Sequence, residues 1–185
     1  MDRLALVERA GEGDHDAFTM LATSAAHRLD GAARLILRDP ELARDAVQNT
    51  LMRAWRDLPG LRDPDRFDAW LHRLLVNSSL DEARRRRRRP LEVEIKTIDE
   101  PTGSDTAGHL ADRDLVERAL IRLDPEHRAL VVLHYYLGYQ LPEAATLVGI
   151  SLPAAKSRLH RAMQGLRRSM VDTAAVPEFE GGRTA

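Results

Sequence analysis

The stretch from residue 140 to residue 168, QLPEAATLVGISLPAAKSRLHRAMQGLRR, constrains the fold of this chain more than any other. Apolar residues recur at helical spacing on both sides of Gly149, and a glycine at this place typically ends a helix in the left-handed conformation. Ser151 can cap the second helix, and Pro153 lies in its first turn, where a missing N–H costs little. The stretch therefore predicts two short helices joined by a tight turn.

The second of these helices has an apolar face and a face of small, polar and basic residues. Between Ser151 and Met170 there are five basic residues and no acidic one. Small side chains allow close approach to a major groove, and arginines reach base edges or phosphates. The pattern favours a DNA-binding helix-turn-helix, and the alternative is a surface helix with solvated arginines. The residues expected to face outward are Ala154, Ser157, Arg158 and Arg161.

Helical periodicity continues through the rest of the chain, and no pair of strands is evident. We expect helices over 3–12, 16–38, 41–58, 64–89, 110–122 and 125–137. In the third of these, the expected buried stripe is Val47, Leu51, Ala54, Trp55 and Leu58. Asp63 and Asp124, each followed by a proline, are expected to cap the helices after them.

Two segments lack this periodicity. Residues 90–109 are rich in Pro, Gly, Thr and acidic side chains, as in a flexible linker, and residues 171–185 are expected to form a disordered tail. The predicted fold is all-α: two small helical domains, 1–89 and 110–170, joined by a flexible linker, with the helix-turn-helix in the second.

Composition excludes several classes of function. The chain has no cysteine, and its seven histidines are scattered without a metal-ligand spacing. It contains no phosphate-cradling glycine loop and no evident pair of nucleophile and base, so we expect no enzyme, cofactor or metal site. No apolar run approaches the ~20 residues that a membrane helix needs, and the N-terminus lacks a signal-peptide core. We expect a cytoplasmic protein without membrane insertion.

Three motifs, in this order and spacing, resemble the extracytoplasmic-function (ECF) sigma factors of the bacterial sigma-70 family. They are DAVQNTLMRAW at 45–55, DRFDAWLHRLLVNSSLDEARRRRRR at 65–89 and GISLPAAKSRLHRAM at 149–163. The resemblance implies a protein that binds core RNA polymerase and directs it to promoters. It also implies that the domain 1–89 melts and reads the −10 element and that the domain 110–170 reads the −35 element. An anti-sigma factor is a further implied partner.

The resemblance assigns a role to one face of the third helix. Opposite the expected buried stripe lie Asp45, Gln48, Asn49 and Met52. By similarity, this face binds core RNA polymerase, and the alternative is a solvated helix face. The family usually has an acidic residue where this chain has Asn49.

The resemblance also assigns residues to the two promoter elements. For the −10 element they are Arg62, Asp63, Asn77, Arg84 and Arg85, and for the −35 element they are Ala154, Lys156, Ser157, Arg158 and Arg161. Asn77 is alternatively a helix residue that bonds to its own surroundings. The run of six arginines before Pro90 fits phosphate contacts or a solvated helix end. Pro142 and Pro153 depart from the usual family pattern.

A second hypothesis is a helix-turn-helix regulator that never binds core polymerase. Such a protein would have no need of residues 41–89 and would bind duplex DNA alone. A sigma factor is expected to bind DNA weakly until polymerase is present.

Overall fold

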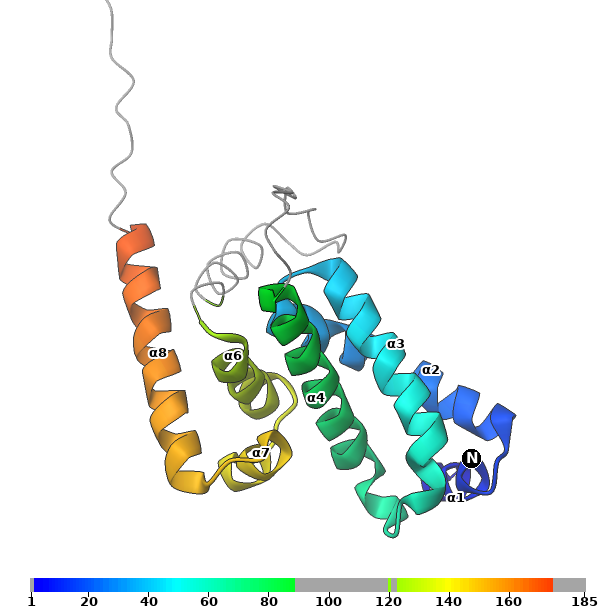
Figure 1. The fold of residues 1–185 in the computed structure, drawn as a ribbon. Helices are drawn as coiled ribbons and strands as arrows, with labels where there is room; N and C mark the ends of the chain where they lie inside the picture. The colour runs from blue at the N-terminus through cyan, green and yellow to red at the C-terminus, as the bar shows by residue number, and fades with distance from the viewer. Residues whose placement is uncertain (1, 89–119, 121–122, 175–185) are drawn as a thin grey trace, which may run out of the picture.

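The computed structural model describes residues 2–88, 120 and 123–174, and every element assigned within these ranges is helical (Figure 1). The N-terminal half contains α1 (Arg3–Gly11), α2 (His15–Leu37), α3 (Pro40–Asp57) and α4 (Phe67–Arg88). The C-terminal half contains α6 (Pro125–Val131), the π-helix η3 (Val132–Tyr136), α7 (Leu141–Val148) and α8 (Leu152–Ala174). The predicted all-α fold with a helix-turn-helix in the C-terminal half is confirmed.

Aspartate side chains fix where the first helices begin. Asp14 accepts hydrogen bonds from the N–H groups of Asp16 and Ala17, both at 3.0 Å. Asp39 does the same at the start of α3, which has Pro40 as its first residue. A carboxylate at this position satisfies N–H groups that have no partner inside the helix. These local signals explain why the predicted boundaries lie within a residue or two of the observed ones.

The loop between α3 and α4 contains two single 3₁₀ turns, η1 (Leu58–Gly60) and η2 (Pro64–Arg66). The helix predicted from Pro64 therefore starts as a 3₁₀ turn and becomes α-helical at Phe67. The carboxylate of Asp63 accepts a hydrogen bond from the N–H of Asp65 at 3.2 Å, as its predicted capping role requires.

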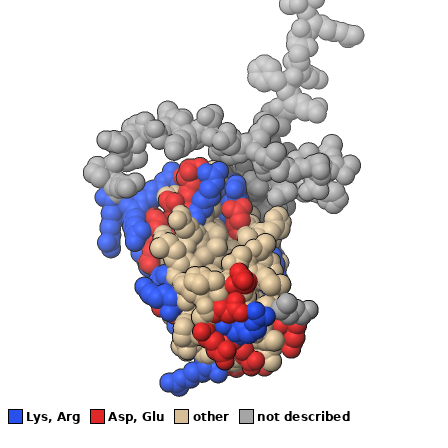
Figure 2. Space-filling view, turned by 90° about the vertical axis from the view of Figure 1, so that its right-hand side faces the viewer, with Lys and Arg blue, Asp and Glu red and all other residues tan. Residues whose placement is uncertain are grey.

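The buried stripe of α3 differs from the predicted one. Its fully buried positions are the small residues Ala43, Ala46, Thr50 and Ala54. Of the predicted stripe, Ala54 and Leu58 are buried, and Val47 and Leu51 are half-buried beside the core. Trp55 is half-buried and its ring lies 5.1 Å from that of Phe18. Small residues lie where α3 approaches α2 and α4 closely, so the larger side chains pack along the edges of the contact. Figure 2 views the side on which α1 to α3 lie, where uncharged side chains occupy the middle of the face.

Two glycines in the C-terminal half have a left-handed backbone conformation, and each follows a helix. Gly138 (φ 80°) follows η3, and Gly149 (φ 77°) ends α7, as predicted. α8 begins at Leu152, so Pro153 lies within its first turn as predicted, and the helix continues to Ala174. The predicted disordered tail is therefore wrong for residues 171–174, and its remainder lies outside the described residues. Asp124 was predicted to cap α6 but makes no side-chain cap. Its carboxylate instead accepts a hydrogen bond from Arg87 of α4 at 2.7 Å.

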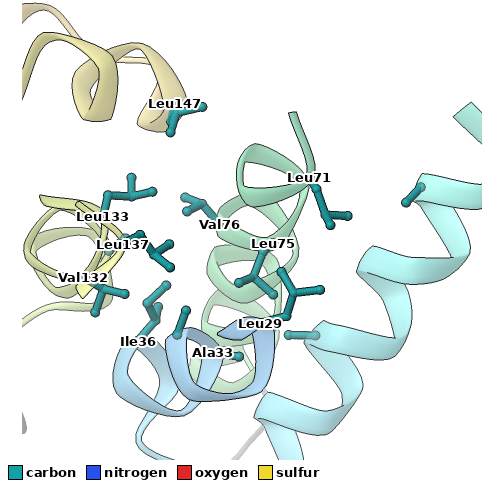
Figure 3. Close-up of a cluster of buried hydrophobic side chains, with 14 of the residues drawn as sticks. Leu29, Ala33, Ile36, Leu71, Leu75, Val76, Val132, Leu133, Leu137 and Leu147 are labelled. Atoms are coloured by element: carbon teal, nitrogen blue, oxygen red, sulfur yellow. The ribbon is translucent and has the colours of Figure 1, made fainter. Parts of the chain in front are cut away.

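One hydrophobic core continues from the N-terminal half into the C-terminal half. Helix α4 contacts α6 and α7, and α2 contacts α6 and η3. In Figure 3, Val76 of α4 points toward Leu133 and Leu137, and all three side chains belong to the same buried cluster. The two halves are therefore packed on each other rather than held apart.

The predicted linker over 90–109 lies outside the described residues, as does most of the helix predicted at 110–122. Among the described residues, no helix is both long and apolar enough to span a membrane.

Candidate nucleic-acid interface

Helices α7 and α8 form the predicted helix-turn-helix. The N–H of Gln140 donates to the Glu143 carboxylate at 3.0 Å, which secures the start of α7. The left-handed Gly149 then turns the chain, and the N–H of Ala154 donates to Oγ of Ser151 at 3.4 Å at the start of α8. Ala155 and Ala162 of α8 are fully buried, so the opposite side of the helix is turned outward.

The residues predicted to contact the −35 element differ in how exposed their side chains are on α8. Lys156, Ser157 and Arg161 are exposed, and Arg161 lies over the Ser157 hydroxyl at 3.4 Å. Ala154 is half-buried. The side chain of Arg158 is only 26% exposed, because its guanidinium pairs with the Glu126 carboxylate of α6 at 2.8 Å.

The arginine run at the end of α4 is paired with carboxylates. Arg84 contacts Asp81 and Glu126, and Arg85 contacts Glu82 at 2.8 Å. Arg86 and Arg87 contact Asp39 and Asp124, at 2.9 and 2.7 Å. These arginines remain more than half exposed. Exposed ion pairs of this kind contribute little to stability, roughly 0–1 kcal/mol each, and exchange readily for other anions.

The structure brings part of the predicted −10 set together with part of the −35 set. Arg84, of the predicted −10 set, lines the same groove as Arg158 and Arg161 of α8. Arg87 of α4, which was not in that set, lines it too, as do Asp124 just before α6 and Glu126 and His127 within α6. The groove has a volume of about 320 Å³.

The predicted −10 residues are not gathered in one place. Arg62 and Asp63 are exposed in the loop before α4, whereas Arg84 and Arg85 lie at the far end of this 22-residue helix. A helix of that length spans ~33 Å. Asn77 is exposed between the two ends, and no hydrogen bond joins its side chain to another described residue. Its amide is thus available to a ligand.

The face of α3 predicted to bind core polymerase is largely open. Asp45 and Gln48 are exposed, and Met52 is 63% exposed. Asn49 differs from these, because it is half-buried and donates from its side-chain amide to Oε1 of the buried Glu82 at 3.2 Å. Three of the four predicted residues are therefore exposed to solvent. The fourth, Asn49, is half-buried and hydrogen-bonds α3 to α4.

Two buried polar residues, His72 and Arg128, and the half-buried Tyr139 lie at the boundary between the two halves and were not predicted. Nδ1 of His72 lies 2.7 Å from the Tyr139 hydroxyl, and burial lowers the pKa of His72 to about 4 and raises that of Tyr139 to about 12. Arg128 donates to the carbonyl oxygens of Ile36, Leu120 and Leu123. Burial lowers the Arg128 pKa to about 10, which leaves it cationic at neutral pH. Nothing in the local sequence pattern distinguishes these residues from surface ones.

Within the described ranges, no three His, Asp or Glu side chains gather as a metal site would require.

Comparison with known proteins covers most of the chain. The family model for sigma-70 region 2 matches residues 21–89, and that for sigma-70 region 4 matches residues 113–166. The chain is 35% identical over 159 residues to the ECF RNA polymerase sigma factor SigM of Mycobacterium tuberculosis, covering 84% of this chain and 78% of SigM. It is 32% identical over 158 residues to the RNA polymerase sigma-E factor of Streptomyces coelicolor, covering 83% and 88%.

Its fold is also similar to that of CnrH in a complex with the cytosolic domain of CnrY. This match has a TM-score of 0.67 and 28% identity, and it covers 94% of this chain and all of the other. RpoE of Bartonella quintana, solved with the anti-sigma factor NepR, has a TM-score of 0.68 at 23% identity and shares the fold.

Proposed function

The chain belongs to the ECF sigma factors of the sigma-70 family, and we propose that α3 docks it on core RNA polymerase while α4 and α8 contact the two promoter elements. As an alternative sigma factor it directs transcription initiation. The proposal divides this work between residues 1–89 and residues 110–170, and it places the protein in the cytoplasm, where promoter DNA and polymerase are found.

The observation that carries the proposal is the combination of an open helix-turn-helix with a second, separate exposed surface. A DNA-binding regulator needs the first but not the second. The exposed face of α3 combines an acidic, an amide and a thioether side chain: Asp45, Gln48 and Met52. Met52, which is 63% exposed, gives this polar face an apolar side chain for a protein partner to cover.

For the −10 element, we propose that Asn77 hydrogen-bonds an unstacked base, with Arg62 and Asp63 in the loop before α4 beside the opened strands. Its exposed amide supports this role, since it offers both donors and acceptors. Because Arg84 and Arg85 lie at the other end of α4, we assign them to backbone phosphates.

For the −35 element, we propose that Ala154, Ser157, Arg158 and Arg161 face the major groove and that Lys156 contacts phosphate. The exposure of Ser157, Lys156 and Arg161 supports this arrangement. Arg158 must break its ion pair with Glu126 before its guanidinium can contact DNA.

An anti-sigma factor belongs to the same proposal. Two proteins of similar fold were solved with such a partner or with the cytosolic domain of another protein. A partner of this kind would cover the surfaces that bind polymerase.

Polymerase binding can be tested with a matched pair of methionines. Met52→Glu on α3 should lower the affinity of the fluorescently labelled chain for core RNA polymerase by roughly tenfold or more, because a charge replaces an apolar contact. Met20→Glu on α2, at a side chain that is 47% exposed, is the control and should bind normally. Equal affinities for the two variants would argue against α3 as the docking surface. If the unmodified chain bound no polymerase but selected specific duplex DNA, the regulator hypothesis would replace the sigma assignment.

A further inference from the structure

Helix α1 lies against the loop that joins α3 to α4, which consists of residues 58–66 (Figure 1). We propose that α1 is a positioning element for recognition of the −10 element, and that Arg3 holds this loop in the conformation that determines its base preference. The inference rests on the proposed function, since it takes Arg62 and Asp63 in the loop as −10 contacts. It gives a role to residues outside the segment 21–89 that the region 2 family model matches.

Both ends of the loop are buried, while its tip is open to solvent. Leu58 at its start and Phe67 directly after its end are each only 2% exposed. Arg62 and Asp63 lie between them in the sequence and are exposed. The position of these two exposed side chains therefore depends on how the buried ends of the loop are held.

The nine-residue helix α1 contacts the loop at both of these ends. Its last residue, Gly11, lies near the start of the loop, where a Cβ on the glycine would be 4.0 Å from the carbonyl oxygen of Leu58. Its first residue, Arg3, lies at the end of the loop, with its guanidinium carbon 5.9 Å from the centre of the Phe67 ring. The contacts of α1 with η1 and with η2 agree with this placement. The helix, ~14 Å long, therefore extends from one end of the loop to the other.

Arg3 makes two contacts with the first turn of α4. Its guanidinium donates a hydrogen bond to the carboxylate of Asp68, and it lies over the ring of Phe67. Contacts of a guanidinium with a carboxylate and with an aromatic face each have a preferred geometry. Because Phe67 and Asp68 directly follow the loop, the two contacts together fix where the loop enters α4.

Helix α1 is itself firmly placed on the N-terminal half. Leu6, Val7 and Ala10 are buried in the hydrophobic core, and α1 packs along α2. The Asp2 carboxylate caps the helix by accepting from the N–H of Leu4 at 3.2 Å. A helix held in this way restrains the loop beside it, because the loop cannot shift without breaking contacts with a fixed neighbour.

The hydrogen bonds within the loop order its tip. The Asp63 carboxylate accepts from the N–H of Asp65 at 3.2 Å and lies 3.4 Å from the Arg66 guanidinium. The N–H of Leu61 donates to the carbonyl oxygen of Leu58 at 2.9 Å. All of these partners belong to the loop itself, so they give it a shape but do not set its place in the protein. Its place depends on packing at its two ends, where α1 lies.

The pair of Arg3 and Asp68 suits positioning better than stabilisation of the fold. Its two side chains are 47% and 54% exposed, and exposed ion pairs contribute little to stability. Loss of the pair should therefore leave the chain folded and able to bind polymerase, while the end of the loop gains freedom to move. Base preference is then the property that Arg3 controls.

The test is a selection with the holoenzyme, formed from the full chain and core RNA polymerase. The probe is a pool of single-stranded oligodeoxynucleotides with a central run of randomised bases. Sequencing of the bound and unbound fractions gives the base preference at each position. Two reference variants, Arg62→Ala and Asn77→Ala, identify the positions that are read from the loop and those that are read from α4.

The test variants are Arg3→Met, which keeps an unbranched side chain, and Asp68→Asn. Each should reduce the enrichment of the preferred base by roughly three- to tenfold at the loop-read positions, because a loosely held loop loses part of a base contact. The positions that depend on Asn77 should keep their preference. Arg3→Lys retains a cation that can pair with Asp68 and lie over Phe67, so it should keep the parental profile.

Arg34→Met is the matched control. Arg34 pairs with Asp30 on α2 at 2.6 Å and is 48% exposed, against 47% for Arg3. It lies shortly before the start of α3, whereas the loop follows the end of that helix. The control should keep the parental base preference. Affinity for core polymerase and the midpoint of thermal unfolding, measured in parallel, should match between Arg3→Met and Arg34→Met.

Unchanged preference at the loop-read positions in Arg3→Met and Asp68→Asn would overturn the proposal. So would a loss of affinity that is equal for all sequences, because α1 would then support the fold in general rather than the loop. Failure of the proposed function gives a different result, namely a parent holoenzyme that shows no base preference anywhere in the pool. That result would contradict the reading of the −10 element by this loop and, with it, the role of α1.

Discussion

The side-chain amide of Asn49 on α3 donates to Oε1 of Glu82 on α4, at 3.2 Å, and Glu82 is only 7% exposed. This contact explains why an amide stands where an acidic residue is usual in the family. A carboxylate at position 49 would face a buried carboxylate within hydrogen-bond distance, and neither would have a proton to share. The same Glu82 oxygen also accepts a hydrogen bond from Arg85 at 2.8 Å.

We expect Asn49→Asp to destabilise the fold by roughly 1–3 kcal/mol at pH 7, because a donor is lost and two like charges meet. Protonation of either carboxylate relieves the repulsion, so the deficit should shrink as the pH falls. Urea denaturation of both proteins between pH 7 and pH 4 measures this. Adding Glu82→Gln to the Asn49→Asp variant should restore most of the lost stability. An Asn49→Asp protein as stable as the parent at pH 7 would show that the contact is unimportant.

His72 should make the stability of the protein depend on pH. Burial lowers its pKa to about 4 from the ordinary 6.5, so the folded protein favours the neutral ring. This contribution is fully present above pH 6.5 and is lost as the pH falls toward 4. The loss amounts to roughly 3 kcal/mol, at about 1.36 kcal/mol for each unit of the pKa difference.

The measurement is the free energy of unfolding between pH 7.5 and pH 4 in the parent and in His72→Gln. The variant cannot titrate at this position, so its curve should be flatter over that range. His27→Gln, at an exposed position on α2, is the control and should follow the parent. Parallel curves for His72→Gln and the parent would assign the acid sensitivity to other groups.

Gly149→Ala tests the turn of the helix-turn-helix. No atom lies within 4 Å of a Cβ at this position, but the backbone has a φ of 77°, which an alanine adopts only with strain. We expect a loss of roughly 1–2 kcal/mol, measured as a lower midpoint of thermal unfolding. Gly60→Ala has equally open space and no positive φ, so it should unfold as the parent does. A similar midpoint for the two variants would mean that backbone strain at residue 149 is negligible.

The helices and the turn could be predicted because their signals are local. Aspartate before Pro40, glycine at position 149 and apolar residues at helical spacing act within a few residues of where they stand. The buried stripe of α3 could not be predicted correctly, because the fully buried residues Ala43, Ala46 and Thr50 carry little hydrophobic signal.

The boundary between the halves could not be predicted, because its contacts join residues far apart in sequence. Arg128 looks like a surface residue until the Ile36 carbonyl, 92 residues away, is brought against it. Asp124 looks like a helix cap until Arg87 approaches. The exposed faces of α3 and α8 can be predicted from helical spacing. The ion pairs that the arginines of α4 and α8 form with carboxylates of other parts of the chain depend on how the helices pack.

Transcription in vitro tests the central claim most directly. Core RNA polymerase, the purified chain and sheared genomic DNA are combined, and the RNA start sites are mapped. We predict starts that share two upstream elements. Arg158→Ala/Arg161→Ala should reduce transcription from these starts by roughly ten- to a hundredfold while binding of polymerase persists, because each lost base contact costs about 1–3 kcal/mol. Arg28→Ala/Arg34→Ala removes the same charge from exposed positions on α2 and should leave the starts unchanged. Defined starts that survive the loss of both α8 arginines, or no defined starts from the unmodified chain, would contradict the account.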